Sequence, residues 1–490
     1  MQNKWAIISF TKSHKRLFLR WWIKQIWIIP GIVILLFSCE KERFLTGDSV
    51  SLTFSCDTVI FDTVFTTIGS TTKYFQVINP YSKALMISEI YLAGGENSNF
   101  RLNIDGLKAL QLENIELPAG DSLYVFVEVT VDPQNQNSPM VVKDSVVFIT
   151  NGNFQDIDLV AWGQDVHLIN GEIVQTQTWI NDKPYLVYNS MLIDSMQKLT
   201  LDPGVRVHFH RNSTMYIMGS LEIHGTIEEP VVFQGNRLES EYAEIPGQWG
   251  GLYFLNGSVG NIIEYLEIRN GTSGLHLGNL YSEKEPPDLI ISNSIITQMN
   301  FAGISAINAK IDASNCVIAD CGFYGIVLTT GGEYEFNHCT VSNNWKYFNR
   351  VTPTVLITNY YNLNDTEIFT GKLEKASFGN CIVYGDMETE IGFDKVGEGS
   401  LNYYFDHCLI KVDTSEVDVS DPMRYNNVFI NNAPGFIAID SMNFQLDSCA
   451  FVLDKGSQEI GMRFPNDILG NSRINDPGPD IGAYERSDDQ

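Results

Sequence analysis

The stretch Phe336-Asn337-His338-Cys339-Thr340-Val341 is one of six copies of a short pattern between residues 291 and 451. Each copy has an apolar residue, a mostly polar one, then Asn, His or Ser, then Cys or Ser, and then two mostly apolar residues. The fourth position is occupied in turn by Ser294, Cys316, Cys339, Cys381, Cys408 and Cys449. These positions lie 22, 23, 42, 27 and 41 residues apart, which indicates a structural repeat of about 20 to 25 residues.

A repeat of this length with a strand-type pattern indicates stacked coils. Leucine-rich repeats have a similar period, but the helical half of such a repeat is missing from these copies. We therefore expect an all-β region, wound as a right-handed parallel β-helix over residues 166–465. The two long intervals correspond either to two coils or to one coil with an inserted loop.

The fourth position of the pattern predicts an inward-facing ladder. Equivalent residues of stacked coils lie ~4.8 Å apart, and an inward position needs a small uncharged side chain such as Cys or Ser. The preceding Asn or His can bond along the stack and satisfy backbone groups at a bend. Parallel side-chain directions favour buried thiols in this ladder, although the spacing also permits disulfides.

Short apolar runs between Leu199 and Phe233, punctuated by glycines, predict the first coils. The segment Gln248-Trp249-Gly250-Gly251-Leu252 resembles one that is common in bacterial β-helix proteins of the pectin-lyase-like class. This resemblance implies the fold over residues 166–465, but a fold of this kind does not identify an activity.

Residues 466–490 contain the sequence Asp480-Ile481-Gly482-Ala483-Tyr484-Glu485. It resembles a C-terminal motif of bacterial surface β-helix proteins. Since a bare coil exposes unpaired N–H and C=O groups, we expect this capping or anchoring segment to close the open end of the stack.

Residues 51–165 show short alternating runs separated by turns. In the run 122–131, the residues Leu123, Val125, Val127, Val129 and Val131 share one face. This alternation predicts an antiparallel β-sandwich. The segments Val77-Ile78-Asn79-Pro80 and Phe100-Arg101-Leu102 resemble the immunoglobulin-like domains of the abnormal-spindle type. The resemblance implies a spacer or interaction module.

The first 38 residues resemble an export signal. Six basic residues up to Lys24 precede a short apolar run, Ile26–Phe37, which is too short for a membrane span. The sequence Leu35-Leu36-Phe37-Ser38-Cys39 resembles a bacterial lipobox, which implies lipid attachment at Cys39; an uncleaved anchor helix is the alternative. Residues 39–50 read as a tether, and Glu40-Lys41-Glu42 resembles the tag that routes Bacteroidota lipoproteins to the outer face.

The chain has 490 residues, with 32 basic and 59 acidic side chains and a net charge of −27. Without the six basic residues of the signal the net charge is −33, which would repel nucleic acid phosphates and anionic membrane surfaces. We therefore exclude a nucleic-acid partner. We expect a cell-envelope lipoprotein of the outer membrane, facing the periplasm or the exterior, with its membrane contact made by the lipid.

The coils were expected to carry catalytic carboxylates if the chain were an enzyme. The Asn-Thr-Asp, Asp-Asp, Gly-His-Gly and Arg-Ile-Lys signals of polygalacturonase-type hydrolases are missing from them. Lyases need a base beside acidic calcium ligands. Residues 302–341 offer one base, Lys310, and four acids: Asp312, Asp320, Glu333 and Glu335. We therefore assign no catalytic residue.

Histidines suggest no metal site. His208 and His210 alternate along one run, which favours a solvated strand face over a metal pair. His276 is expected to face outward, and His338 and His407 occupy ladder positions. No cofactor is expected.

Two other clusters have alternative interpretations. One is an acidic loop that contains Asp413, Glu416, Asp418 and Asp421. Its carboxylates could hold calcium, but a solvated loop without a metal is the favoured interpretation. An aromatic cluster lies in or beside the longest insertion and could stack on sugars or pack over the coils: Trp345, Tyr347, Phe348, Tyr360 and Tyr361.

Taken together, these features favour non-catalytic binding of a glycan or a surface protein by the flank of the β-helix. The alternative is a polysaccharide lyase or glycoside hydrolase of the pectin-lyase-like class. An enzyme requires carboxylates or a base that converge in a groove, whereas a binding protein requires only aromatic and amide side chains.

Overall fold

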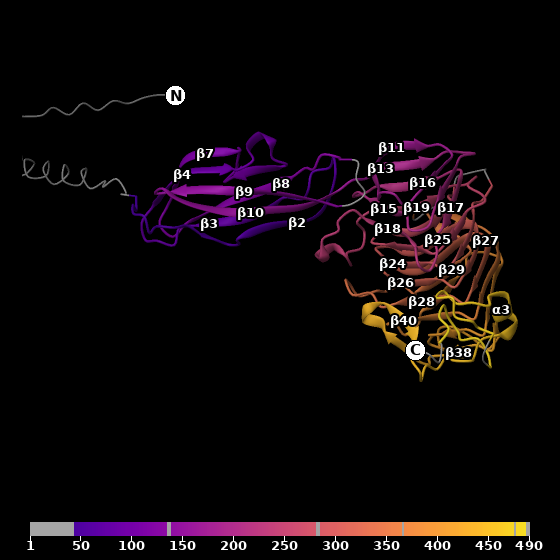
Figure 1. Ribbon diagram of the computed structural model, residues 1–490. Helices are drawn as coiled ribbons and strands as arrows, with labels where there is room; N and C mark the ends of the chain where they lie inside the picture. Colours follow the sequence, from indigo (N-terminus) through magenta and orange to yellow (C-terminus); the bar gives the residue numbers. More distant parts are fainter. Residues whose placement is uncertain (1–43, 135–138, 281–284, 365–366, 475–476, 487–490) are drawn as a thin grey trace, which may run out of the picture. The chain divides into compact units, whose positions relative to one another are not determined.

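The computed structural model describes residues 44–134, 139–280, 285–364, 367–474 and 477–486 (Figure 1). Cys39 and the predicted export signal lie outside the described residues. The chain divides into two compact units, Met1–Asp132 with Val141–Trp162, and Pro133–Met140 with Gly163–Gln490. Among the residues that the structure describes, no helix is long and apolar enough to cross a membrane.

The first unit consists of two five-stranded sheets. One sheet has the order β1(Thr53–Phe54), β3(Lys73–Ile78), β8(Ser122–Val129), β5(Phe100–Ile104), β6(Leu107–Lys108). The other has the order β2(Thr58–Phe65), β10(Asn153–Gln164), β9(Met140–Thr150), β4(Leu85–Leu92), β7(Gln111–Leu117). Alternate residues of β8 are buried, and the rings of Phe75 and Phe148 meet between the sheets with centroids 6.1 Å apart. The unit is therefore a two-layer β-sandwich.

The second unit is built on a 26-stranded sheet that runs from β11(His167–Val174) to β38(Phe429–Ile430). Strands pair in parallel with their counterparts one coil on, as β16 with β19 and β19 with β22. The coils stack along the unit in Figure 1. The prediction of an all-β chain with a long parallel sheet is confirmed.

Three strand columns make up the coils after β11, β12(Gln177–Trp179) and β13(Tyr185–Ile193). The first column is β15(Arg206–Phe209), β18(Val231–Gly235), β21(Leu266–Arg269), β24(Ile295–Met299), β26(Val317–Cys321), β28(Thr340–Asn343), β33(Ile382–Gly385), β36(Leu409–Ile410), β38. The second is β16(Thr214–Ile217), β19(Gly251–Phe254), β22(Ser273–Leu277), β25(Ala302–Ser314), β27(Tyr324–Asn337), β29(Val355–Thr358), β34(Ile391–Asp394). The third is β14(Lys198–Leu201), β17(Ser220–His224), β20(Ile262–Glu264), β23(Asp288–Ser292), the second halves of β25 and β27, β32(Leu373–Gly379), β35(Leu401–Asp406), β37(Tyr425–Asn426).

The remaining elements are short. They are η1(Gly95–Asn97), η2(Ser240–Tyr242), the hairpin β30(Tyr360–Asn362) and β31(Ile368–Thr370), β39(Phe436–Ala438), η3(Ile439–Ser441), β40(Asn443–Leu446) and α3(Gln458–Arg463).

A column of small buried side chains precedes the strands of the first column. Each of these side chains is followed by the first residue of a strand, and these first residues pair between coils, for example Val317 with Thr340 and Thr340 with Ile382. The fully buried members are Ser294, Cys316, Cys339, Cys381 and Cys408. The four cysteines are free thiols, and the N–H groups of Cys339 and Cys381 each donate to the sulfur one coil on, at 3.4 Å.

The residue before each of these side chains turns the corner in a left-handed conformation. The φ angles are between 48° and 51° for Asn293, Asn315, His338, Asn380 and His407. Asn reaches this conformation more readily than most residues with a side chain. The corner side chains also bond between coils: Asn315 Nδ2 donates to Asn293 Oδ1 at 3.0 Å, and Asn380 Nδ2 to His338 Nε2 at 3.0 Å.

The two long intervals of the repeat have different causes. Because Thr340 pairs directly with Ile382, the 42-residue interval between Cys339 and Cys381 is one coil with an insertion that carries the β30–β31 hairpin. Cys449 is exposed and follows β40, outside the parallel sheet. It differs from the five buried residues because its segment matches the pattern in composition but belongs to no coil.

The C-terminal tail lies along the side of the coils instead of closing their open end. Ile481 packs in one cluster with Ile382 and Leu409, and Ala483 packs in another with Val317. The outward face of the first strand column is apolar at these positions, so the tail removes it from water.

A buried ion pair fixes the tail. Arg473 Nη1 donates to Glu485 Oε2 at 2.9 Å, and the same oxygen accepts the Asp480 N–H at 2.9 Å. Arg473 Nη2 reaches the corner residue Asn315, 3.2 Å from Oδ1. The side chains of Arg473 and Glu485 are 0% and 2% exposed, so each charge depends on the other for compensation.

Replacing Cys339 with Asp places a carboxylate in the buried column, among the apolar side chains of the core. We expect the apparent melting temperature, measured by circular dichroism, to fall by about 10 °C or more. Cys449→Asp is the matched control and should leave the melting curve unchanged, because Cys449 is exposed. Equal melting curves for the two variants would contradict the buried column.

Replacing Glu485 with Gln leaves Arg473 buried without its counter-charge. We expect a loss of about 3–5 kcal/mol in the stability of the tail, measured by hydrogen exchange at amides of residues 477–486. The control Glu374→Gln disrupts the exposed Lys372–Glu374 pair and should cost about 0–1 kcal/mol. Similar losses in the two variants would show that the buried pair does not hold the tail.

Candidate functional site

A groove runs along the corner between the second and third strand columns, with a volume of about 710 Å³. Its floor includes Asn256, which follows β19, and Asn308 and Thr330, which lie within β25 and β27 of two successive coils, and one wall is Phe369–Lys372 at the end of the inserted hairpin. This volume lies in the range of small-molecule sites. We call it the corner groove.

Thr330 on the floor has an unusual conformation for a β-branched residue. Its φ is +62°, and it is followed by Gly331 and Gly332, also at positive φ. A Cβ at Gly371 would collide with the carbonyl oxygen of Thr330. Strain of this kind costs about 1–3 kcal/mol and concentrates at functional sites.

The hydroxyl of Thr330 is buried and meets no hydrogen-bond partner among the described residues. A hydroxyl both donates and accepts, and leaving a buried one unsatisfied costs about 1–3 kcal/mol. Asn308, at φ +49°, presents an exposed amide one coil before it.

Charged side chains border the same groove in register. Asp288, Lys310 and Glu333 are neighbours on three successive coils. The Asp288 carboxylate accepts the backbone N–H of Gly260 at 2.5 Å. Glu374 pairs with Lys372 at 2.8 Å. The groove therefore combines both signs of charge with amides and a hydroxyl.

Of the five residues that the sequence singled out between 302 and 341, only Lys310 and Glu333 line the groove. Asp312 and Glu335 are register partners elsewhere on the third column. Burial raises the pKa of Asp312. For Glu335, burial also acts to raise the pKa, but hydrogen bonds from Lys375 and Arg463 outweigh it and lower the pKa to about 2. The Lys375 pair, at 2.5 Å, links two successive coils, and the Arg463 pair, at 2.7 Å, ties α3 to the coil, so Glu335 has a structural role.

The predicted aromatic cluster is split by the fold. Tyr360 and Tyr361 lie on β30 of the inserted hairpin. Trp345, Tyr347 and Phe348 instead join rings at a different corner, where Phe323 lies 5.6 Å from Phe348 between centroids. The two groups cannot be separated from the sequence alone, because the insertion hides which residues return to the coil.

The histidines are explained by local packing. His208 is buried, not solvated as predicted, and burial lowers its pKa to about 4. His210 stacks on Tyr188 at 4.3 Å, and His276 lies 3.3 Å from the hydroxyl of Ser305. In the described ranges no three His, Cys, Asp or Glu side chains are grouped to hold a metal.

The acidic loop uses its carboxylates in its own turns. Asp413 accepts the N–H of Ser415 at 2.8 Å, and Asp418 accepts that of Ser420 at 2.9 Å. These backbone hydrogen bonds, together with the serine hydroxyls, lower the pKa of both groups.

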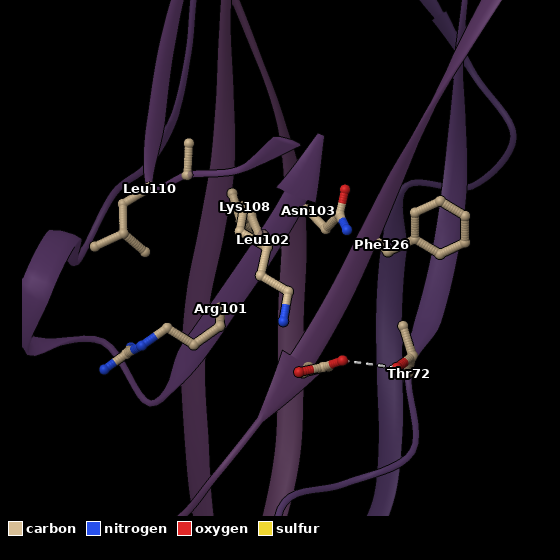
Figure 2. A pocket seen from close by; sticks show the side chains of 9 residues that line it. Thr72, Arg101, Leu102, Asn103, Lys108, Leu110 and Phe126 are labelled. Atoms are coloured by element: carbon tan, nitrogen blue, oxygen red, sulfur yellow. Dashed lines mark hydrogen bonds between the residues drawn. The ribbon is translucent and has the colours of Figure 1, made fainter. Parts of the chain in front are cut away.

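The sandwich has a hollow of its own on the outer face of one sheet, about 530 Å³ in volume (Figure 2). Phe126, Asn103 and Lys108 border it, and Thr72 donates to Glu128 at 2.9 Å. Arg101 Nη1 donates to the carbonyls of its own loop at Ser98 and Phe100. We place the candidate site in the corner groove because polar and charged side chains of successive coils line it together with the strained, buried Thr330.

Comparison with known proteins gave no match to a family model and none to a curated protein. Solved structures gave weak similarity. One variant of the catalytic domain of GH87 alpha-1,3-glucanase, in complex with nigerose, aligns at 11% identity with a TM-score of 0.28, over 74% of this chain and 87% of its own. A second variant, also in complex with nigerose, aligns at 10% identity with a TM-score of 0.27, over 73% of this chain and 88% of its own. The catalytic unit of the thermostable GH87 alpha-1,3-glucanase from Streptomyces thermodiastaticus strain HF3-3 aligns at 11% identity over 68% of this chain and 79% of its own, with a TM-score of 0.28.

Proposed function

We propose that this chain is a lipid-anchored protein of the cell envelope whose β-helix binds a glycan in the corner groove without cleaving it. The observation that carries the proposal is the strained Thr330, whose buried hydroxyl has no partner among the described residues. A fold retains such strain where the surrounding structure uses it.

The groove chemistry supports a polyhydroxylated ligand. Sugar hydroxyls can donate to Glu333 and accept from Lys310 or the Asn308 amide, and all three residues line the groove. Phe369 adds an apolar surface beside them for the C–H face of a sugar ring.

A second candidate is an inverting glycoside hydrolase. Asp288 and Glu333 both line the groove and bracket Lys310 in register. Two strand spacings separate their backbones by about 10 Å, close to the roughly 6.5–9.5 Å between carboxyl groups of inverting enzymes. In this mechanism one carboxylic acid would protonate the leaving oxygen, and the other carboxylate would activate a water.

Binding is tested by titrating residues 40–490 with neutral oligosaccharides, namely maltohexaose, laminarihexaose and mannohexaose, by calorimetry. Thr330→Val keeps the branched shape and removes the hydroxyl, so we expect about three- to tenfold weaker binding. Thr200→Val on β14 is the control and should bind like the unaltered chain. Full affinity in Thr330→Val would refute the groove as the site.

The same mixtures decide between binding and hydrolysis. Under the binding proposal, no new reducing ends form on prolonged incubation with any of the three oligosaccharides. Reducing ends that appear with the unaltered chain and disappear in Glu333→Gln would replace the binding proposal by the hydrolase.

Lipid attachment is tested in cells that express the full chain. Cys39→Ala removes the acceptor thiol, and we expect the protein to leave the membrane fraction, because anchoring depends on the acyl chains. Cys56→Ala, which alters a free cysteine of the sandwich, should remain with the membrane. Retention of Cys39→Ala in that fraction would contradict lipidation.

A further inference from the structure

A second corner of the coils holds a set of rings and a small crevice. The rings form the aromatic patch, which consists of Phe301, Phe323, Tyr347 and Phe348. The crevice, about 20 Å³ in volume, is lined by Glu244, Asp320, Asn344, Trp345, Lys346 and Tyr347 among others. We call it the indole crevice. It lies between the first and second columns, whereas the corner groove lies between the second and third.

The indole of Trp345 is buried, 7% exposed, and its Nε1–H meets no acceptor in the part of the chain that the structure describes. An indole N–H only donates, and leaving a buried donor unsatisfied is unfavourable. The ring is held by contacts with Tyr347 and Phe348, with centroids at 5.1 and 5.4 Å. The crevice therefore needs an oxygen acceptor, and its volume admits one water-sized group.

The charges around the crevice disfavour an anionic acceptor. The carboxylates of Glu244 and Asp320 line it, while the only ammonium among its lining residues, that of Lys346, donates to the Asp440 carbonyl at 3.1 Å. Burial raises the pKa of Asp320 to about 6, so its carboxylate still accepts hydrogen bonds at neutral pH. A hydroxyl satisfies both sides, because it accepts from the indole and donates to a carboxylate.

The aromatic patch provides an apolar platform beside the crevice. Phe301 and Phe323 precede equivalent register positions of β25 and β27, and their centroids are 5.9 Å apart. The side chains of Phe323 and Phe348 are 39% and 42% exposed. Contiguous exposed rings of this kind mark interaction surfaces, and their faces suit the C–H face of a pyranose.

We infer that the aromatic patch and the indole crevice form a second glycan-binding site, specific for neutral sugars, in which one sugar hydroxyl accepts from Trp345 Nε1. A uronate is disfavoured because its carboxylate would meet Glu244 and Asp320. The site is independent of the corner groove, since the two share no lining residue.

The direct test follows the indole N–H resonance of Trp345, identified by its absence in Trp345→Phe, while residues 40–490 are titrated with maltohexaose, laminarihexaose, mannohexaose or hexagalacturonate. We expect a saturable shift with at least one neutral hexasaccharide and none with hexagalacturonate. A resonance that moves with none of the neutral sugars, or that moves with hexagalacturonate at lower concentration, overturns the proposal.

Variants separate this site from the corner groove and from a loss of folding. Phe323→Ala should weaken the affinity measured through this resonance about tenfold, and the control Trp162→Phe, at an exposed indole of the sandwich, should leave it unchanged. Trp345→Phe keeps an aromatic ring but lacks the N–H, so its calorimetric affinity for the same sugar should fall about three- to tenfold, with a circular dichroism spectrum that shows the variant to be folded. If Phe323→Ala and Trp345→Phe keep full affinity while Thr330→Val binds more weakly, the groove is retained and this second site is overturned. If the first two variants bind more weakly while Thr330→Val keeps full affinity, this second site is retained and the groove is overturned.

Discussion

Parallel hydrogen bonding between successive coils is the constraint on which the rest of the second unit depends. Each strand of the 26-stranded sheet takes its partners from the coils before and after it, so the environment of a residue is set by its register. At the corner between the third and first columns, the turns at residues 293, 315, 338, 380 and 407 repeat one solution: a left-handed residue whose side chain bonds to a neighbouring coil, followed by a buried one. Asn380 and Cys381 are one example.

This corner explains how far the sequence could predict the fold. The pattern was visible because most coils use Asn or His and then Cys or Ser. The stricter requirement concerns the third residue of the pattern, which adopts a positive φ angle at these corners. Asn427 has φ +49° and precedes Val428, in register with Cys408, although no thiol marks that coil. Ser448 before Cys449 is absent from the positive-φ residues described, and Cys449 lies outside the coils.

The candidate site was harder to predict for a physical reason. Asn308 and Thr330 lie inside the long strands β25 and β27, at bends that do not recur with a fixed residue type. Lys310 and Glu333 were recognisable as charged residues, but so were Asp312 and Glu335, two positions further along the same strands. What separates the pairs is contact across the chain, because Arg463 of α3 binds Glu335 while the groove wall stands beside Glu333.

The three corners of the coil therefore have three different outcomes. The corner between the third and first columns is covered by the tail, whose Arg473 reaches Asn315, and by the start of α3, where the Ser457 carbonyl accepts from Asn380. The other two corners carry the corner groove and the aromatic patch. The buried Arg473–Glu485 pair is costly to desolvate, and such pairs serve best where they fix one arrangement among several. Holding the tail on the apolar face of the first column keeps it apart from the other two corners, where we propose the two ligand sites.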